Sequence, residues 1–122
     1  MYHNQLIGKT GEEIAAEYLL DIGYKIITRN FRCKQGEIDI IAKDKYELIF
    51  IEVKTRTTIK YGKPVEAVNE LKQKHIEKVI KYYLYKNKVT NINIRIDVIE
   101  VYLKYKQNKY AAKINHIKNA IE

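Results

Sequence analysis

Apolar residues recur at helical spacing near the start of the chain. The pattern predicts a helix from about residue 11 to 22, which Gly23 is placed to end. Thr10 and Glu13 have the spacing of a capping box, in which Thr10 is the N-cap and Glu13 bonds back to it. That role occupies Glu13 and leaves Glu12 to point elsewhere. The apolar stripe consists of Ile14, Ala15, Tyr18, Leu19 and Ile22.

Three extended segments follow, separated by turn signals. Residues 24–31 and 37–42 are predicted strands around a turn at 34–36. A second turn, at residues 43–45, leads into a third strand at 47–55. Two successive hairpins predict an antiparallel meander.

A longer helix is predicted at about residues 65 to 86, with Pro64 near its first turn. One of its faces is apolar and the opposite face carries lysines. His75 falls on the apolar face, so we expect it to pack in the core. The apolar stripe is Val68, Leu71, His75, Ile76, Val79, Ile80, Tyr83 and Leu84, and the lysines are Lys72, Lys74, Lys78 and Lys81.

The last part of the chain predicts further strands. In residues 91–105 the apolar side chains change face after Val98, which indicates either a β-bulge or burial of both faces. Residues 110–122 are expected to add a short strand and a helical turn. The order α-β-β-β-α-β-β predicts an α/β fold with a mixed β-sheet flanked by helices. We expect one domain over residues 1–122.

Cysteine content and hydropathy argue against two classes of protein. Cys33 is the single cysteine, so no disulfide within the chain is expected. No apolar run approaches the roughly 20 residues of a membrane helix, and the first residues lack the apolar segment of a signal peptide. We therefore expect a cytoplasmic protein with no membrane partner.

Charge is distributed unevenly along the chain. The net charge is +8, but residues 1–53 carry seven Lys/Arg and nine Asp/Glu (7 − 9 = −2), whereas residues 54–122 carry sixteen and six (16 − 6 = +10). A basic half beside an acidic half indicates a polyanion-binding surface near a site that could hold a cation. The plainer alternative is a set of solvated lysines.

Charged residues end the most apolar run of the chain, LIFIEVKTR at residues 48–56. Because side chains alternate along a strand, Glu52, Lys54 and Arg56 share one face. If the strand register matches, Asp39 of the preceding strand meets Glu52 on that face, with Lys54 close by.

Two carboxylates at such a distance repel each other, and a divalent cation relieves the repulsion. Mg²⁺ takes one or two carboxylates together with waters and phosphate oxygens, so Asp39 and Glu52 suit it, with Mn²⁺ as a substitute and the Val53 carbonyl as a further ligand. The chemistry that follows is metal-assisted hydrolysis of phosphodiesters. Lys54 would orient water or stabilise charge on the phosphate, and Glu12 is a candidate outer acid.

Basic residues nearby are candidate contacts for nucleic acid, namely Arg56, Lys72 and Lys74. Each part of the site has a plainer interpretation. Glu52 and Lys54 could form a cross-strand ion pair. Asp39 could simply be a solubilising charge at a sheet edge. The position of the acids within apolar runs, where unpaired charge is costly, strengthens the catalytic interpretation and leaves the plainer ones open.

Four segments in order, GEIDIIA, IEVKTR, YGKPVEAV and RIDVIEV, closely resemble the YraN-like family of uncharacterised bacterial proteins. The opening GKTGEEIAAEYLLDIGYKIITRNFR and the closing INHIKNA fit the same family, so the resemblance covers nearly the whole chain. That family in turn resembles the PD-(D/E)xK nuclease superfamily and is similar to the archaeal Holliday-junction resolvases.

The resemblance implies a restriction-endonuclease-like core of order αβββαβ with a short C-terminal element. By position, Asp39 matches the aspartate of the motif, Glu52 and Lys54 match its E-x-K, and Glu12 matches the first-helix acid of the resolvases. Ile38 stands where the motif has Pro. Resolvases of this fold act as dimers, so a homodimer is expected by analogy only.

These observations predict a metal-dependent endonuclease that binds nucleic acid. DNA is favoured over RNA, and branched or repair intermediates are candidate substrates. One alternative is a non-catalytic nucleic-acid-binding protein on a nuclease scaffold. A protein–protein adaptor is a weaker alternative.

Overall fold

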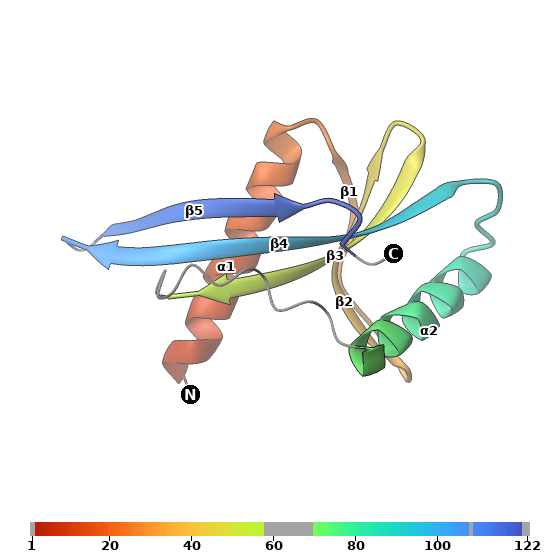
Figure 1. Ribbon diagram of the computed structural model, residues 1–122, viewed down its shortest axis with the longest axis horizontal. Helices are drawn as coiled ribbons and strands as arrows, with labels where there is room; N and C mark the ends of the chain where they lie inside the picture. The colour runs from red at the N-terminus through yellow and green to blue at the C-terminus, as the bar shows by residue number, and fades with distance from the viewer. Residues whose placement is uncertain (1, 58–69, 108, 121–122) are drawn as a thin grey trace.

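The computed structural model describes residues 2–57, 70–107 and 109–120. Two helices and a five-stranded sheet make up this part of the chain (Figure 1). The elements are, in order, α1 (Tyr2–Asp21), β1 (Lys25–Cys33), β2 (Gly36–Asp44), β3 (Glu47–Arg56), α2 (Glu70–Lys86), β4 (Asn93–Lys106) and β5 (Lys109–Ile117).

The sheet is mixed, and its strands lie in sequence order, β1-β2-β3-β4-β5. β1, β2 and β3 form an antiparallel meander, β3 and β4 are parallel, and β5 is antiparallel to β4. The expected meander, mixed sheet and α/β class are confirmed. The order αβββαβ followed by one more strand is the order expected of a restriction-endonuclease-like core.

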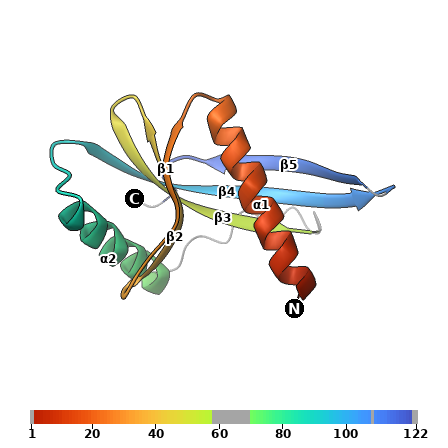
Figure 2. The same ribbon diagram turned by 180° about the vertical axis from the view of Figure 1, so that it is seen from behind.

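The two helices cover opposite faces of the sheet (Figures 1 and 2). Parallel β3 and β4 need a crossover connection, and α2 forms part of it. On the α1 side the fully buried residues include Leu19, Ile40, Ile49, Ile51 and Ile99. On the α2 side the buried residues include Ile41, Phe50, Ile76, Val79 and Tyr83.

α1 begins earlier than the sequence predicts. It starts at Tyr2, so Thr10 lies inside the helix and the predicted capping box is wrong. Glu13 bonds to Arg29 of β1 instead, with Oε1 2.8 Å from the guanidinium Nη1. The helix extends because Ile7, one turn before the predicted start, packs against the core on this side of the sheet. Tertiary packing here overrides the local cap signal.

Gly11 is the point of closest approach between α1 and the sheet. It is buried, and a Cβ at this position would overlap the side chain of Thr55 on β3. A glycine inside a helix costs stability relative to alanine. The contact with β3 explains why the helix carries one here.

The predicted helix at residues 65–86 corresponds to α2, but Pro64, Val68 and the rest of residues 64–69 lie outside the described part of the chain. Within α2 the predicted apolar face is confirmed from Ile76 to Tyr83. His75 is an exception: it is exposed, and its predicted packing in the core is wrong. The buried α2 contacts described on this face begin one residue later, at Ile76.

The middle of β4, from Asp97 to Val101, is buried on both faces, which decides between the two explanations of its apolar pattern. Its register with β3 continues from Asn93 to Tyr102 without a recorded shift, so no bulge explains the change of face after Val98. Ile99 packs on the α1 side and Ile96 packs towards α2. The final strand is longer than expected, because β5 spans nine residues, Lys109–Ile117.

A buried polar network joins β4 and β5 to α1. The Asp97 carboxylate, fully buried, accepts hydrogen bonds from Arg95 at 2.8 and 2.9 Å, from His116 Nε2 at 2.7 Å and from the Asn119 amide at 2.9 Å. His116 Nδ1 lies 2.8 Å from the Tyr18 hydroxyl of α1. Burial alone would raise the pKa of Asp97, but these partners outweigh it and lower the pKa.

Neither helix of the described chain is both long enough and apolar enough to cross a membrane.

The contact at Gly11 yields a test with a matched control. Gly11→Ala is expected to destabilise the fold by about 1–3 kcal/mol, because the new methyl group collides with Thr55. Gly8→Ala, in the same helix but with open space around it, is expected to stabilise the fold by up to about 1 kcal/mol. Urea unfolding of the two variants measures both effects. Equal stabilisation by the two alanines would contradict the close packing.

Candidate functional site

The candidate site lies where β2 and β3 separate. Their recorded pairing ends with Ile40 opposite Ile51, and the same register makes Asp39 and Glu52 the next opposed pair. Beyond this point β2 continues with β1 to Gly36, and β3 continues with β4. The expected neighbouring positions of Asp39 and Glu52 on adjoining strands are therefore present.

The Asp39 side chain bridges the two diverging strands. Its Oδ2 accepts a hydrogen bond of 2.7 Å from the backbone N–H of Val53. Alternation is broken around Asp39, since Ile38 packs on the α2 side and Ile40 packs on the α1 side. Asn30, opposite Asp39 in the register with β1, has a left-handed φ of 54°. This local twist leaves Asp39 half-buried at the junction between the two cores.

The surroundings of Asp39 disfavour the ionised form of its carboxyl group. Burial raises its pKa most, the Glu52 charge raises it further, and the Val53 amide opposes both; Glu12 and Glu37 add to the rise. The resulting pKa is about 7, against an ordinary 3.8. At neutral pH the protonated form of Asp39 is therefore populated together with the ionised form.

Glu12 of α1 belongs to the same group of charges. Burial raises its pKa, Arg29 lowers it, and Glu37, Glu52 and Glu13 raise it. We call Glu12, Glu37, Asp39 and Glu52 the acid cluster. The sequence predicted that Glu12 is free of the cap and is a candidate outer acid of the site. Its electrostatic coupling to Asp39 and Glu52 agrees with that assignment, although the capping argument for it does not hold.

A small pocket of about 270 Å³ opens beside the acid cluster on the α2 side. Glu37, Glu52 and His75 are among the residues that line it. The β1–β2 turn forms one wall and α2 forms the other, through Gln35, Gly36, Ile76 and Val79. The exposed position of His75 thus places a second type of polar group near Glu52, which the helical pattern alone did not reveal.

The basic residues of β3 lie beside another buried acid. In the parallel register Lys54 is the partner position of Glu100 on β4. Glu100 is 1% exposed, accepts a 2.9 Å hydrogen bond from Asn115 and lies 3.6 Å from Arg56 Nε. Sequence reasoning missed Glu100. Its signal was an acid within an apolar strand, the same signal that marked Glu52.

The predicted nucleic-acid contacts are distributed differently. Arg56 forms an ion pair with Glu100, but its side chain remains 39% exposed. Lys74 is exposed on α2, next to His75 of the pocket. The side chain of Lys72 lies outside the described part of the chain.

The donor set of the acid cluster limits the kind of cation it could take. Among the described residues, no group of three or more His, Cys, Asp or Glu side chains is arranged to hold a metal ion. Asp39 and Glu52 carry carboxylate oxygens, and the raised pKa of Asp39 reflects its burial and the Glu52 charge. Oxygen donors in this small number fit Mg²⁺, which keeps several waters, better than Zn²⁺, which takes nitrogen and sulfur ligands.

The raised pKa of Asp39 makes a signed prediction for stability. Because the folded pKa of about 7 exceeds the ordinary 3.8, ionising Asp39 weakens the fold, with the penalty growing between these pH values and complete above pH 7. Asp39→Asn keeps an acceptor for the Val53 amide and removes the charge. The variant is expected to exceed the parent by about 1–2 kcal/mol at pH 8, allowing for solvent screening, and to match it near pH 4.

Urea unfolding across this pH range measures the difference, without divalent ions. Glu17→Gln, at an exposed position of α1, is the control and should show no such trend. A stability difference for Asp39→Asn that is constant with pH would contradict the unusual pKa.

Comparisons with known proteins place the chain in a family. The model of the uncharacterised protein family UPF0102 matches residues 11–101. A UPF0102 protein of Clostridium botulinum is 51% identical over 122 residues, covering 99% of this chain and 98% of its own. One from Clostridioides difficile is 51% identical over 118 residues, covering 97% and 98%. One from Caldicellulosiruptor saccharolyticus is 47% identical over 114 residues, covering 93% and 95%.

One solved structure is similar over most of the chain, Pyrococcus furiosus SfsA in complex with Ca²⁺. It is 17% identical with a TM-score of 0.41, and the match covers 98% of this chain and 65% of that one. The sequence relatives decide the assignment, and they agree with the resemblance to the YraN-like proteins. The chain belongs to the uncharacterised protein family UPF0102.

Proposed function

We propose that this protein is a Mg²⁺-dependent endonuclease that hydrolyses phosphodiester bonds in nucleic acid, with DNA as the favoured substrate. The observation that carries the proposal is the meeting of Asp39 and Glu52 at the separation of β2 and β3, where repulsion and burial raise the pKa of Asp39 to about 7. A cation bound between the two carboxylates would relieve their repulsion, as protonation of Asp39 also does.

Asp39 and Glu52 would hold the cation, with the Val53 carbonyl as a further ligand. The Val53 N–H already fixes one oxygen of Asp39, so the backbone of β3 orients the carboxylate before any ligand binds. When bound, Mg²⁺, or Mn²⁺ in its place, would polarise a phosphoryl oxygen and lower the pKa of water. Lys54, two positions beyond Glu52, supplies a positive group for the charge that develops on the phosphate.

The acid cluster by itself repels nucleic acid. Four mutually interacting carboxylates would oppose the approach of a phosphodiester, so a cation is needed for binding as well as for chemistry. The surrounding basic residues supply the long-range attraction, since the chain as a whole carries +8. Arg56, Lys72 and Lys74 are the proposed phosphate contacts. Glu12 would bind water at the edge of the site.

The test is cleavage of supercoiled plasmid and of branched DNA, with Mg²⁺ and with EDTA. Asp39→Ala and Glu52→Gln are each expected to lower the rate at least about 100-fold, because each removes a group that acts in the transition state. Glu17→Gln, another acid-to-amide change on the exposed surface of α1, should leave the rate unchanged. Circular dichroism confirms folding of every variant. Undiminished cleavage by both site variants would reject the proposal.

One observation favours a second candidate, a nucleic-acid-binding protein without catalysis. The described residues include no three-donor metal group, so the cation could bind too weakly to support turnover. Calorimetry with Mg²⁺ or Mn²⁺, with and without DNA, separates the two candidates. Salt-sensitive DNA binding with no detectable metal site at millimolar concentration would select the binding protein. A homodimer, proposed by analogy with the resolvases, is tested by sedimentation.

A further inference from the structure

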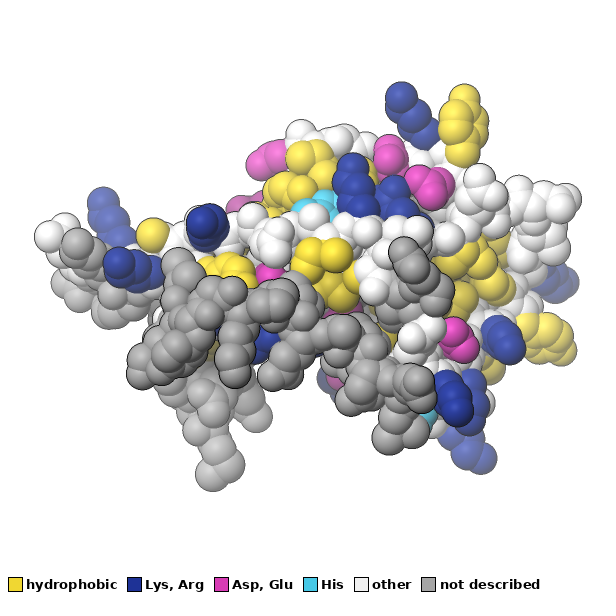
Figure 3. Space-filling model, viewed as in Figure 1, with side chains coloured by type: hydrophobic (Ala, Val, Ile, Leu, Met, Phe, Trp, Pro, Cys, Tyr) yellow, Lys and Arg dark blue, Asp and Glu magenta, His cyan; other side chains and the backbone are white. Residues whose placement is uncertain are grey.

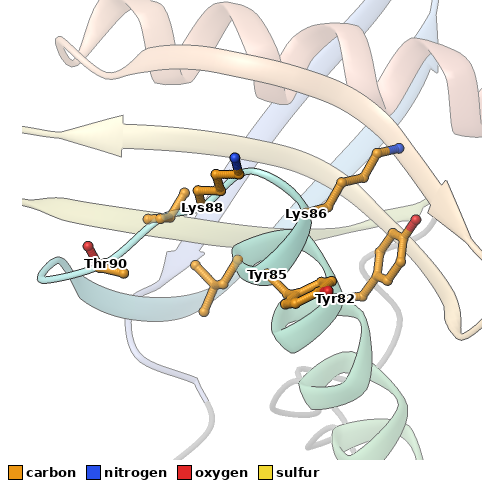
Figure 4. A pocket seen from close by; sticks show the side chains of 7 residues that line it. Tyr82, Tyr85, Lys86, Lys88 and Thr90 are labelled. Carbon is orange, nitrogen blue, oxygen red and sulfur yellow. The ribbon is translucent and has the colours of Figure 1, made fainter.

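A second hollow lies at the other end of α2. It has a volume of about 680 Å³ and is formed by the last turns of α2 and the segment that leads to β4. Figure 4 shows the side chains that line it, among them Tyr82, Tyr85, Lys86, Lys88 and Thr90. The pocket beside the acid cluster involves α2 residues up to Val79, so the two hollows share no lining residue.

Two aromatic rings of this hollow are more exposed than the core ring of Tyr83, although Tyr82 also lies against Phe31, with ring centroids 6.4 Å apart. Tyr83 is 7% exposed and packs edge to face on Phe50, with ring centroids 5.6 Å apart. The two other tyrosines at this end of α2 are more exposed: Tyr85 is 83% exposed and Tyr82 is 37% exposed. Exposed aromatic surface costs free energy in water, so two such rings at one place indicate a ligand that covers them.

The charges around these rings have a single sign. Residues 78–90 contain four lysines and no Asp or Glu: Lys78, Lys81, Lys86 and Lys88, all exposed. Lys86 Nζ lies 5.8 Å from the centre of the Tyr82 ring, which is a cation–π contact. In Figure 3, several dark-blue Lys and Arg side chains lie at the lower right, where Figure 1 shows α2, with an acidic side chain in magenta beside them. The matching ligand is an anion with flat apolar groups.

We propose that this hollow, which we call the Tyr82–Tyr85 platform, binds unpaired nucleotides of single-stranded nucleic acid. A base stacks on the exposed Tyr85 ring, beside Tyr82, and Lys86 and Lys88 contact the phosphates. Stacking requires bases whose faces are free, which a duplex interior does not offer. A protein partner fits less well, because it would have to cover several lysines, and lysine is depleted in protein interfaces.

The platform lies on the same helix as the pocket of the acid cluster. His75 lines that pocket, and Tyr85 follows ten residues later, which is about 15 Å along the helix axis. A strand with a rise of about 3.4 Å per nucleotide covers that distance in four to five nucleotides. The exposed Lys78 and Lys81 lie between the two in sequence. This part of the inference rests on the proposed function: the substrate would combine a cleavable bond with an unpaired arm a few nucleotides away.

The test measures binding without metal, so that it does not depend on cleavage. Fluorescence anisotropy with labelled dT12 and rU12, and with a blunt 12-base-pair duplex, is recorded in EDTA at two salt concentrations. Tyr85→Ala is expected to weaken single-strand binding roughly 5- to 100-fold and to leave duplex binding unchanged. Tyr85→Phe should keep the affinity, because the stacking face is retained. The ratio of the dT12 and rU12 affinities identifies the sugar that the platform accepts.

Tyr46→Ala is the matched control, since Tyr46 is 80% exposed but lies in the β2–β3 turn. Equal losses for Tyr46→Ala and Tyr85→Ala would overturn the platform, as would absence of single-strand affinity in the parent protein even if it cleaves duplex DNA. Self-association that disappears in Tyr85→Ala would assign the hollow to a second copy of the chain instead. Single-strand binding without any cleavage would support the platform and reject only the nuclease.

Discussion

The hydrogen bond from the Val53 amide to the Asp39 carboxylate organises the rest of the site. Where β2 and β3 separate, a backbone N–H of β3 would lose its cross-strand partner, and a side chain of β2 takes it instead. Satisfying one buried amide in this way brings a carboxylate beside Glu52 in a half-buried setting. The same contact therefore gives the Val53 amide its hydrogen bond and places the Asp39 charge where it is unfavourable. The fold accepts a poorly stabilised acid to complete its sheet.

Much of this arrangement could be predicted from the sequence, because strand alternation and short turns are local signals. The turns at 34–36 and 43–45 define the meander and hence the opposition of Asp39 and Glu52. The start of α1 could not be found in the same way. Thr10 and Glu13 give a strong local cap signal, and only the packing of Ile7 on a distant sheet overrides it.

Long-range partners also explain the other misses. Glu100 is buried by strands on both sides and bonded to Asn115 of β5, a contact that no local pattern reveals. His75 has the helical spacing of a core residue, but the described packing of α2 on the sheet begins at Ile76, and His75 lines a pocket. In both cases the residue type was visible, and its surroundings were decided by elements far along the chain.

The network around Asp97 has a consequence for how the chain reaches its native state. The contact between Tyr18 and His116 joins residues 98 positions apart, and Asn119 adds its amide to the same carboxylate. Closing so large a loop is entropically expensive and slow, so α1 gains this anchor only after the last strand has joined the sheet. During synthesis the first helix to emerge can thus pack on the earlier strands through its apolar face, but its polar attachment to the sheet is completed last.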